Sequence, residues 1–146
     1  MNKIAGIFLV LGTACFGQQN QEIEKPVRNL FLAMKNADPE LLKSVFTENA
    51  ILQTVAKDGS VKSDHIQDFI TSISKFSKGD LDERITIEAI HTDGILASIF
   101  TPYSFYLKEK FSHCGANSFQ LVKQNNEWKI QYIIDTRRKD QCKDIK

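Results

Sequence analysis

A histidine and a cysteine lie side by side at His113 and Cys114, within the stretch FSHCGANSF. Such a pair is compatible with a nucleophile and its base, with half of a metal site, or with one end of a disulfide. The surrounding sequence predicts a β-strand, in which consecutive side chains point to opposite faces. Because a base on the opposite face cannot activate the thiol, the pattern disfavours a cysteine nucleophile.

The spacing of the possible metal ligands is not that of a zinc site, which uses closely spaced pairs. Those outside the N-terminal stretch are His65, His91, His113, Cys114 and Cys142. The chain also has neither a glycine-rich phosphate loop nor a serine-nucleophile motif. We therefore expect no metal site and no cofactor.

Strand parity assigns the polar residues of this stretch to faces. Phe119 and Leu121 mark the core face, and His113 and Asn117 share their parity, so these two are predicted to point into the interior and Cys114 away from it. His113 has two interpretations: an acid or base with a pKa near neutrality, or a core-edge histidine satisfied by a tyrosine or backbone partner. Tyr103 and Tyr106 are three residues apart, so at most one of them shares a face with His113.

The last strand ends in DTRR, which carries charge. Its buried face is predicted from alternate residues: Trp128, Ile130, Tyr132 and Ile134. Asp135 and Arg137 should then face away from the core, as an ion-paired strand end or part of a dimer interface. The functional alternative is that Arg137 binds an anionic ligand group. In LDERI (residues 81–85) the charges are expected at the surface, where Arg84 could pair with Asp135.

The elements that position these residues follow from periodicity. Apolar residues at helical spacing predict a helix over 22–36 with Pro26 near its first turn, a short helix capped by Asp38, and a third helix capped by Ser63 or Asp64. Strands are predicted over 49–55, around 85–89, and over 96–107, 110–123 and 128–136, with turns at Asp93-Gly94, Lys108-Glu109 and Asn125-Asn126. Helices followed by a meander predict an α+β class, with helices on one face of a curved antiparallel sheet.

This order of elements resembles the cone-shaped fold of the nuclear transport factor 2-like superfamily, which includes ketosteroid isomerase, scytalone dehydratase and the SnoaL-like cyclases. The stretches NADPELLKSVFTENAIL, LDERITIEAIHTDGILASIFTPYSFYL, FSHCGANSFQLVK and WKIQYIIDTRR resemble its secreted bacterial branch, often labelled "putative lumazine-binding". The resemblance implies three N-terminal helices on the sheet and a cavity between the two. It does not fix the chemistry, because one scaffold serves many functions.

The first 17 residues have the layout of a secretory signal peptide: Lys3, an apolar run over 4–11, then small residues. We expect cleavage after Gly17, a single domain over 18–146, and a periplasmic or secreted protein without stable membrane insertion. Lipid anchoring at Cys15 and an uncleaved anchor are the alternatives. In an oxidising compartment the two remaining cysteines, Cys114 and Cys142, are predicted to form a disulfide.

Removing residues 1–17 removes only Lys3 of the charged residues, which leaves 18 basic and 18 acidic residues. This balance argues against a nucleic-acid partner. We expect a small, partly apolar ligand in a pocket rimmed by His113, Asn117 and one of the two tyrosines. Two alternatives stay open: a cofactor-independent isomerase, dehydratase or cyclase that uses His113, and a homodimeric interaction module. The dimer would form through an outer sheet face that carries Ile99, Tyr103 and Phe105.

Overall fold

The computed structural model describes residues 13–143 and residue 145, and begins with a long helix, α1 (Thr13–Asn36). The apolar run over 4–11 lies outside the described residues, and the expected cleavage point after Gly17 falls within α1. Because α1 begins earlier than predicted, Pro26 lies in its interior instead of its first turn. Its predicted apolar stripe is buried: Ile23, Val27, Leu30, Phe31 and Met34.

Two shorter helices follow, α2 (Pro39–Ser44) and α3 (Ile66–Ile73). Asp38 caps α2 as predicted, because its carboxylate accepts a hydrogen bond of 2.9 Å from the Leu41 amide. The predicted cap of α3 is wrong: Ser63 and Asp64 belong to a strand, and His65 takes the N-cap position without a side-chain hydrogen bond. None of the helices in the described part of the chain has both the length and the apolar character that crossing a membrane requires.

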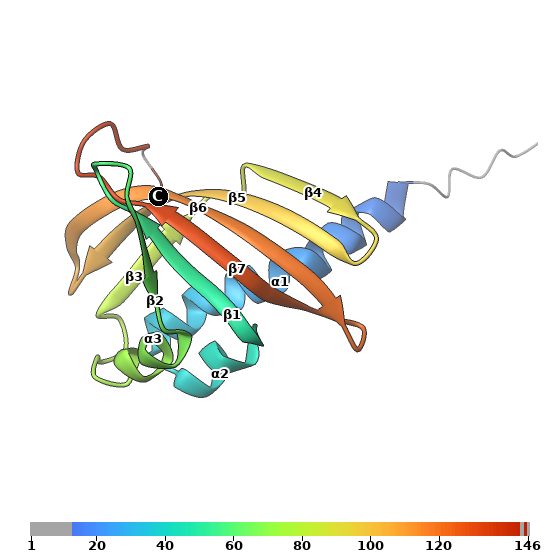
Figure 1. Cartoon of the computed structure of the whole chain (residues 1–146), viewed down its shortest axis with the longest axis horizontal. Coiled ribbons are helices and arrows are strands. Elements are labelled where there is room, and N and C mark those ends of the chain that lie inside the picture. The colour runs from blue at the N-terminus through green and yellow to red at the C-terminus, as the bar shows by residue number, and fades with distance from the viewer. Residues whose placement is uncertain (1–12, 144, 146) are drawn as a thin grey trace, which may run out of the picture.

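Seven strands form one curved sheet, and the helices lie together on one side of it (Figure 1). The strands are β1 (Phe46–Val55), β2 (Val61–Asp64), β3 (Leu81–Ile85), β4 (Ala89–Asp93), β5 (Leu96–Leu107), β6 (Lys110–Gln124) and β7 (Glu127–Thr136). Their order is β2-β1-β7-β6-β5-β3, and β4 also pairs with β5. The α+β class is therefore confirmed, although β1 runs parallel to β7 in an otherwise antiparallel sheet.

The predicted turns between the long strands are present. Lys108 and Glu109 both have positive φ, as do Asn125 and Asn126, which is the backbone of the tight turns that suit the twist of a hairpin. The turn after Asp93 joins β4 to β5. As a result β3 and β4 share one edge of β5, β4 along its first half and β3 along its second.

Strand β7 changes the face that it buries at Gln131. In the pairing with β6, Tyr132 is opposite Gln120 but Ile130 is opposite Leu121, so Gln131 is an extra residue on β7. Its side-chain amide accepts a hydrogen bond from Thr47 Oγ1 at 2.9 Å and donates one to the Asn49 carbonyl at 3.2 Å. The bulge is thereby held against an irregular part of β1.

This bulge overturns the predicted orientation of the DTRR segment. Before it, Trp128 and Ile130 are buried in the core. After it, Ile133 is buried and Asp135 and Arg137 point towards the helices instead of away from them.

The predicted outer face of β5 is also wrong. Ile99 is a core residue, and Tyr103 and Phe105 line a cavity on the helix side of the sheet. Phe100, which has the opposite parity, is exposed. Both parities of this strand carry apolar side chains, so the sequence pattern alone does not distinguish the faces.

The C-terminal tail folds back onto the sheet through the predicted disulfide between Cys114 and Cys142, whose Cα atoms are 5.7 Å apart. Next to it, the backbones of Cys114 and Arg138 exchange two hydrogen bonds of 2.8 Å. These contacts fix the end of β7 and the residue that follows it, Arg137, beside β6.

Candidate binding site

A cavity lies between the helix side of the sheet and α3, and it has two parts. The outer chamber, of about 480 Å³, is walled by apolar residues of the helices and the loop after α3 on one side: Met34, Phe69, Ile73 and Phe76. The inner chamber, of about 110 Å³, extends into the core and is walled by Leu30, Phe31, Leu52, Phe119 and Ile133. Glu83, Asp135 and Arg137 line both chambers and therefore lie where they meet.

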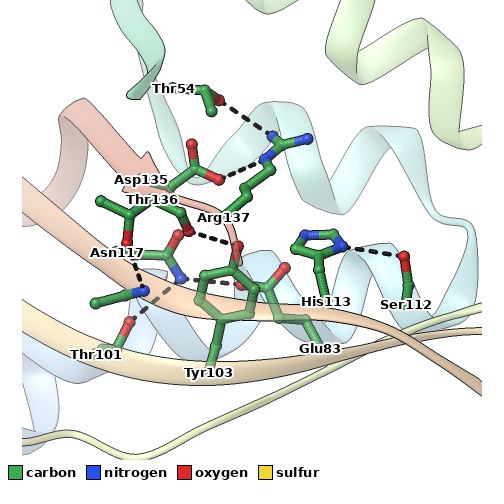
Figure 2. Close-up of polar contacts among 11 residues, drawn as sticks. Thr54, Glu83, Thr101, Tyr103, Ser112, His113, Asn117, Asp135, Thr136 and Arg137 are labelled. Atoms are coloured by element: carbon green, nitrogen blue, oxygen red, sulfur yellow. Dashed lines mark hydrogen bonds and ion pairs between the residues drawn. The ribbon is translucent and has the colours of Figure 1, made fainter. Parts of the chain in front are cut away.

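Glu83 reaches the cavity from β3. It is paired across the sheet with Phe105, which is paired in turn with His113, so the three residues form one row on the cavity face. Asn117 Nδ2 donates a hydrogen bond of 2.9 Å to Glu83 Oε1 (Figure 2). No described residue makes a hydrogen bond to the other oxygen, Oε2, which leaves it available to a molecule in the cavity.

The environment of Glu83 favours the protonated carboxyl. Burial raises its pKa to about 7, and the nearby charge of Asp135 acts in the same direction. The hydrogen bond from Asn117 and the charge of Arg137 oppose this rise without cancelling it. Near neutral pH, Glu83 is therefore present in both protonation states.

A second row crosses the sheet from Thr101 through Asn117 to Asp135, and all three side chains are buried. Asn117 Nδ2 also approaches Thr101 Oγ1 at 3.4 Å, which orients the amide towards Glu83. Asp135 Oδ1 is buried and has no hydrogen-bond partner among the described residues. A buried oxygen in this state is uncommon and costs free energy.

Arg137 brings a positive charge to the cavity. Its Nε donates to Asp135 Oδ2 at 2.9 Å and its Nη2 to Thr54 Oγ1 at 3.2 Å. Partial burial disfavours its charge, but the hydrogen bond to Asp135 and the negative charges of Asp135 and Glu83 together outweigh this effect and raise the pKa of the guanidinium. Figure 2 shows Arg137, Glu83 and His113 pointing to the same side of the sheet.

His113 lines the outer chamber as its parity predicts. Its Nδ1 lies 3.0 Å from Ser112 Oγ, and its ring packs against Tyr103 and Phe105 with centroids 5.6 and 5.1 Å away. Burial lowers its pKa, and the charge of Arg137 lowers it further, so the imidazole is neutral at physiological pH. No carboxylate of the described residues makes a hydrogen bond to this ring.

Of the two candidate tyrosines, Tyr103 lines the cavity and Tyr106 does not. The Tyr103 hydroxyl donates a hydrogen bond of 2.9 Å to the Thr136 carbonyl, and its pKa is raised by burial. Tyr106 stacks edge-on against Phe111 and lies under the Arg84 guanidinium, 4.3 Å from its ring centroid. Arg84 pairs with Asp82, so the predicted pairing with Asp135 is wrong.

Gly115 lies between His113 and Asn117 on the same face and makes room for these contacts. A Cβ atom at this position would overlap the Thr136 carbonyl oxygen and lie 2.8 Å from Tyr103 Cε1. Only glycine therefore lets the end of β7 approach β6 closely enough to accept the Tyr103 hydrogen bond.

The structure places His113 and Asn117 on the cavity face that strand parity predicts, and it places Tyr103 there where the sequence left the choice between the two tyrosines open. The sequence prediction did not include Glu83. A signal was present in the alternation of LDERI, where Glu83 shares parity with Leu81 and Ile85 and Asp82 does not. Because Asp82, Glu83 and Arg84 are three consecutive charged residues, they have the pattern of a surface group, and this parity is easily overlooked. Nothing in the sequence indicates that Asn117, 34 residues away, provides the donor.

A family model described as "Putative lumazine-binding" matches residues 18–132, and no curated protein matches the chain. Solved structures show the same fold. An NTF2-like protein of unknown function from Shewanella baltica OS155 has a TM-score of 0.68 at 18% identity, over 84% of this chain and 96% of that one. A second, from Silicibacter pomeroyi DSS-3, has a TM-score of 0.70 at 14% identity, over 84% and 98%. A domain with a cystatin-like fold from Nostoc punctiforme PCC 73102 has a TM-score of 0.67 at 15% identity, over 85% and 80%.

Proposed function

Since the chain belongs to the putative lumazine-binding family, we propose that it binds a small, partly apolar molecule in the outer and inner chambers. One observation carries this proposal: a cavity of about 480 Å³ between the sheet and α3 is lined by apolar side chains such as Phe69, Ile73 and Phe105 and also by polar ones, with Glu83, Asp135 and Arg137 at its inner, polar end. This volume is within the range of small-molecule sites, in which apolar contacts provide affinity and placed polar groups provide orientation.

The polar end favours a ligand that carries both an acceptor and a donor. Arg137 presents guanidinium donors to an anionic or carbonyl oxygen. Glu83 presents a carboxyl oxygen, Oε2, to which no described residue donates a hydrogen bond. The apolar portion of the ligand would lie against Phe69 and Ile73 of α3.

Native mass spectrometry of the protein purified from its own host tests this proposal. We expect a retained ligand in the wild type and a loss of at least about tenfold in affinity in Arg137→Ala, because a charge-assisted hydrogen bond contributes about 1.5–3 kcal/mol. Arg138→Ala is the matched control, since its side chain lies outside the cavity and bonds to the Gln141 carbonyl. Absence of any ligand, together with an unchanged Tm across a panel of metabolites, would contradict the proposal.

We propose further that residues 1–17 direct export and are removed, so that the mature protein works in the periplasm or outside the cell. The disulfide supports an oxidising compartment. Intact mass of the protein from its host should show cleavage after Gly17. A lipid on Cys15 or an intact N-terminus would contradict this proposal.

We also propose a homodimer. Because Ile99, Tyr103 and Phe105 face the helices, its interface would use other apolar residues of the sheet. The exposed apolar side chains of β5 and β6 are Leu96, Phe100, Leu107 and Phe111. Light scattering of the purified protein should give the mass of two chains, and Phe100→Glu should give the mass of one. A single-chain mass for the wild type would contradict it.

A further inference from the structure

We propose that the ligand of the two chambers is an organic cation, a small molecule in which a protonated amine or another positively charged nitrogen is attached to an apolar body. This inference rests on the proposed binding function and names the charge of the ligand in the same site. Three observations carry it: the balance of charge along the cavity lining, a carboxyl oxygen without a partner, and aromatic side chains next to that oxygen.

The cavity lining carries more acidic than basic side chains. Its carboxyl groups are those of Asp64, Asp68, Glu83 and Asp135, and among the described residues that line the chambers Arg137 is the only arginine or lysine. The charge of Arg137 is compensated locally, because its Nε is bonded to Asp135 Oδ2 at 2.9 Å. The other three carboxyl groups therefore have no arginine or lysine partner within the lining.

Two of these carboxyl groups lie where the cavity meets solvent. Asp64 at the end of β2 and Asp68 in the first turn of α3 are exposed, and neither makes an ion pair with a described residue. Carboxylates that line one side of a cleft attract ions of the opposite charge from solution. The outer chamber should therefore favour the entry of cations over that of anions.

Glu83 is the group that a cation would meet inside the cavity. The Asn117 amide holds Glu83 Oε1 at 2.9 Å, and no described residue donates a hydrogen bond to Oε2. Because Glu83 lines both chambers, a ligand nitrogen at their junction lies close to this oxygen. An ammonium group there supplies the missing donor and the missing positive charge in one charge-assisted hydrogen bond.

Aromatic side chains surround the same position. Phe105 is paired with Glu83 across the sheet and lines the outer chamber, and Phe69 of α3 lines both chambers as Glu83 does. The faces of aromatic rings attract cations, and the rings also provide apolar contact area for the rest of a ligand. A carboxylate next to aromatic rings therefore suits a charged nitrogen on an apolar body.

Arg137 adds a second requirement for the ligand. Its Nε and Nη2 bind Asp135 and Thr54, which leaves other N–H groups of the guanidinium free of these two bonds. These groups can donate to a carbonyl or hydroxyl oxygen of a ligand whose nitrogen faces Glu83. The favoured ligand therefore combines a positive nitrogen with a neutral acceptor.

The affinity for a cation should depend on pH. Burial raises the pKa of Glu83 to about 7, so the carboxylate that attracts the cation forms as the pH rises through this value. The other ionisable groups of the lining are Asp64, His65, Asp68, Tyr103, His113, Asp135 and Arg137. His113 loses its positive charge as the pH rises, which acts in the same direction, so it needs a control of its own.

Three probes that share one apolar group separate the effect of charge from that of shape. Between about pH 5.5 and 8, 1-naphthylmethylamine is a cation, 1-naphthalenemethanol is neutral and 1-naphthylacetate is an anion. Affinities are measured by NMR titration of protein labelled with nitrogen-15, at pH 7.5 and low salt. We expect the wild type to bind the amine at least about tenfold more tightly than the alcohol, and the anion most weakly.

Matched variants assign the effect to Glu83. Glu83→Gln keeps an oxygen that accepts from Asn117, and should lower the affinity for the amine by about tenfold while leaving that for the alcohol within about twofold. The rise in amine affinity through about pH 7 should be lost in Glu83→Gln and kept in His113→Gln. Asp82→Asn removes a neighbouring carboxylate that forms ion pairs outside the cavity lining, and should leave both affinities unchanged.

Three results would overturn the proposal: the alcohol or the anion binds as tightly as the amine, Glu83→Gln leaves the amine affinity unchanged, or the wild type binds none of the probes. Native mass spectrometry distinguishes such a failure from failure of the proposed binding function. A retained ligand without a basic or permanently charged nitrogen contradicts the assigned charge but supports binding, whereas absence of a ligand together with an unchanged Tm across the metabolite panel contradicts both.

Discussion

Asn117 and Glu83, which are 34 residues apart in the sequence, are joined by a hydrogen bond of 2.9 Å from the amide nitrogen to the carboxyl oxygen. The bond favours the ionised carboxyl and opposes the burial that raises the pKa of Glu83. The two residues belong to β6 and β3, which are separated in the sheet by β5. The protonation state of Glu83 therefore depends on a hydrogen bond between β6 and β3, which lie on either side of β5.

Removing this donor should raise the pKa of Glu83. A hydrogen bond to a charged group contributes about 1.5–3 kcal/mol, so Asn117→Ala should move the Glu83 pKa upwards by about one to two pH units. Carbon-13 NMR of protein labelled at the glutamate carboxyl carbons measures this directly. Ser118→Ala, on the other face of the same strand, should leave the Glu83 resonance unchanged, and an unchanged pKa in Asn117→Ala would contradict the assigned role.

The raised pKa of Glu83 predicts a pH dependence of stability with a definite sign. Between pH 4.5 and about 7 the folded protein keeps a proton that the unfolded chain releases, so the free energy of unfolding falls as the pH rises through this window. The full effect is about 3 kcal/mol, at 1.36 kcal/mol per pKa unit. The lowered pKa of His113 makes the free energy of unfolding rise with pH just below pH 6.5, so the effects of the two residues partly offset each other.

Comparison of the wild type with Glu83→Gln isolates the glutamate. Urea denaturation should show the variant to be more stable than the wild type at pH 8, with the difference disappearing near pH 4. A constant difference across this range would show that Glu83 has an ordinary pKa in the folded protein.

The disulfide should stabilise the tail and the whole domain. The cysteines are 28 residues apart, and the chain-entropy relation gives about 3–4 kcal/mol for a loop of this size. The double variant Cys114→Ala, Cys142→Ser should lose about this much in urea denaturation, and reductant should affect the wild type but not the variant. Protein cleaved after Gly17 should contain no free thiol before reduction, and two free thiols would contradict the pairing.

Gly115→Ala should be strongly destabilising for a one-methyl change. The added Cβ would overlap the Thr136 carbonyl, a backbone atom that cannot move without displacing the end of β7. We expect a loss of about 2–3 kcal/mol in the free energy of unfolding, as for overpacking of a buried site. Tyr103→Phe removes only the hydrogen bond to that carbonyl and should cost about 1 kcal/mol. Equal effects of the two variants would show that the overlap is relieved without strain.

The sequence predicts the helices, the long strands and much of β6, because periodicity and turn residues are local properties. It does not predict β2, and the single strand expected around 85–89 is divided in the structure into β3 and β4. The pairs Lys108-Glu109 and Asn125-Asn126 mark their turns, and the alternation from His113 to Leu121 places each side chain on its observed face. The sequence does not show how contacts between residues far apart in the chain change the face that a strand buries. Gln131 looks like an ordinary polar strand residue, yet its contacts with Thr47 and Asn49 accompany the bulge that turns Asp135 and Arg137 inwards.

That one extra residue gives β7 two different environments along its length. Before Gln131 the strand contributes Trp128 and Ile130 to the core, and after it Asp135, together with Arg137 just beyond the strand end, lines the cavity. A sequence change that deleted Gln131 would exchange the faces of all residues beyond it without altering a single side chain of the site. In this scaffold, one residue inserted into or deleted from a strand can therefore add polar groups to the cavity or remove them, even when the site residues themselves are unchanged.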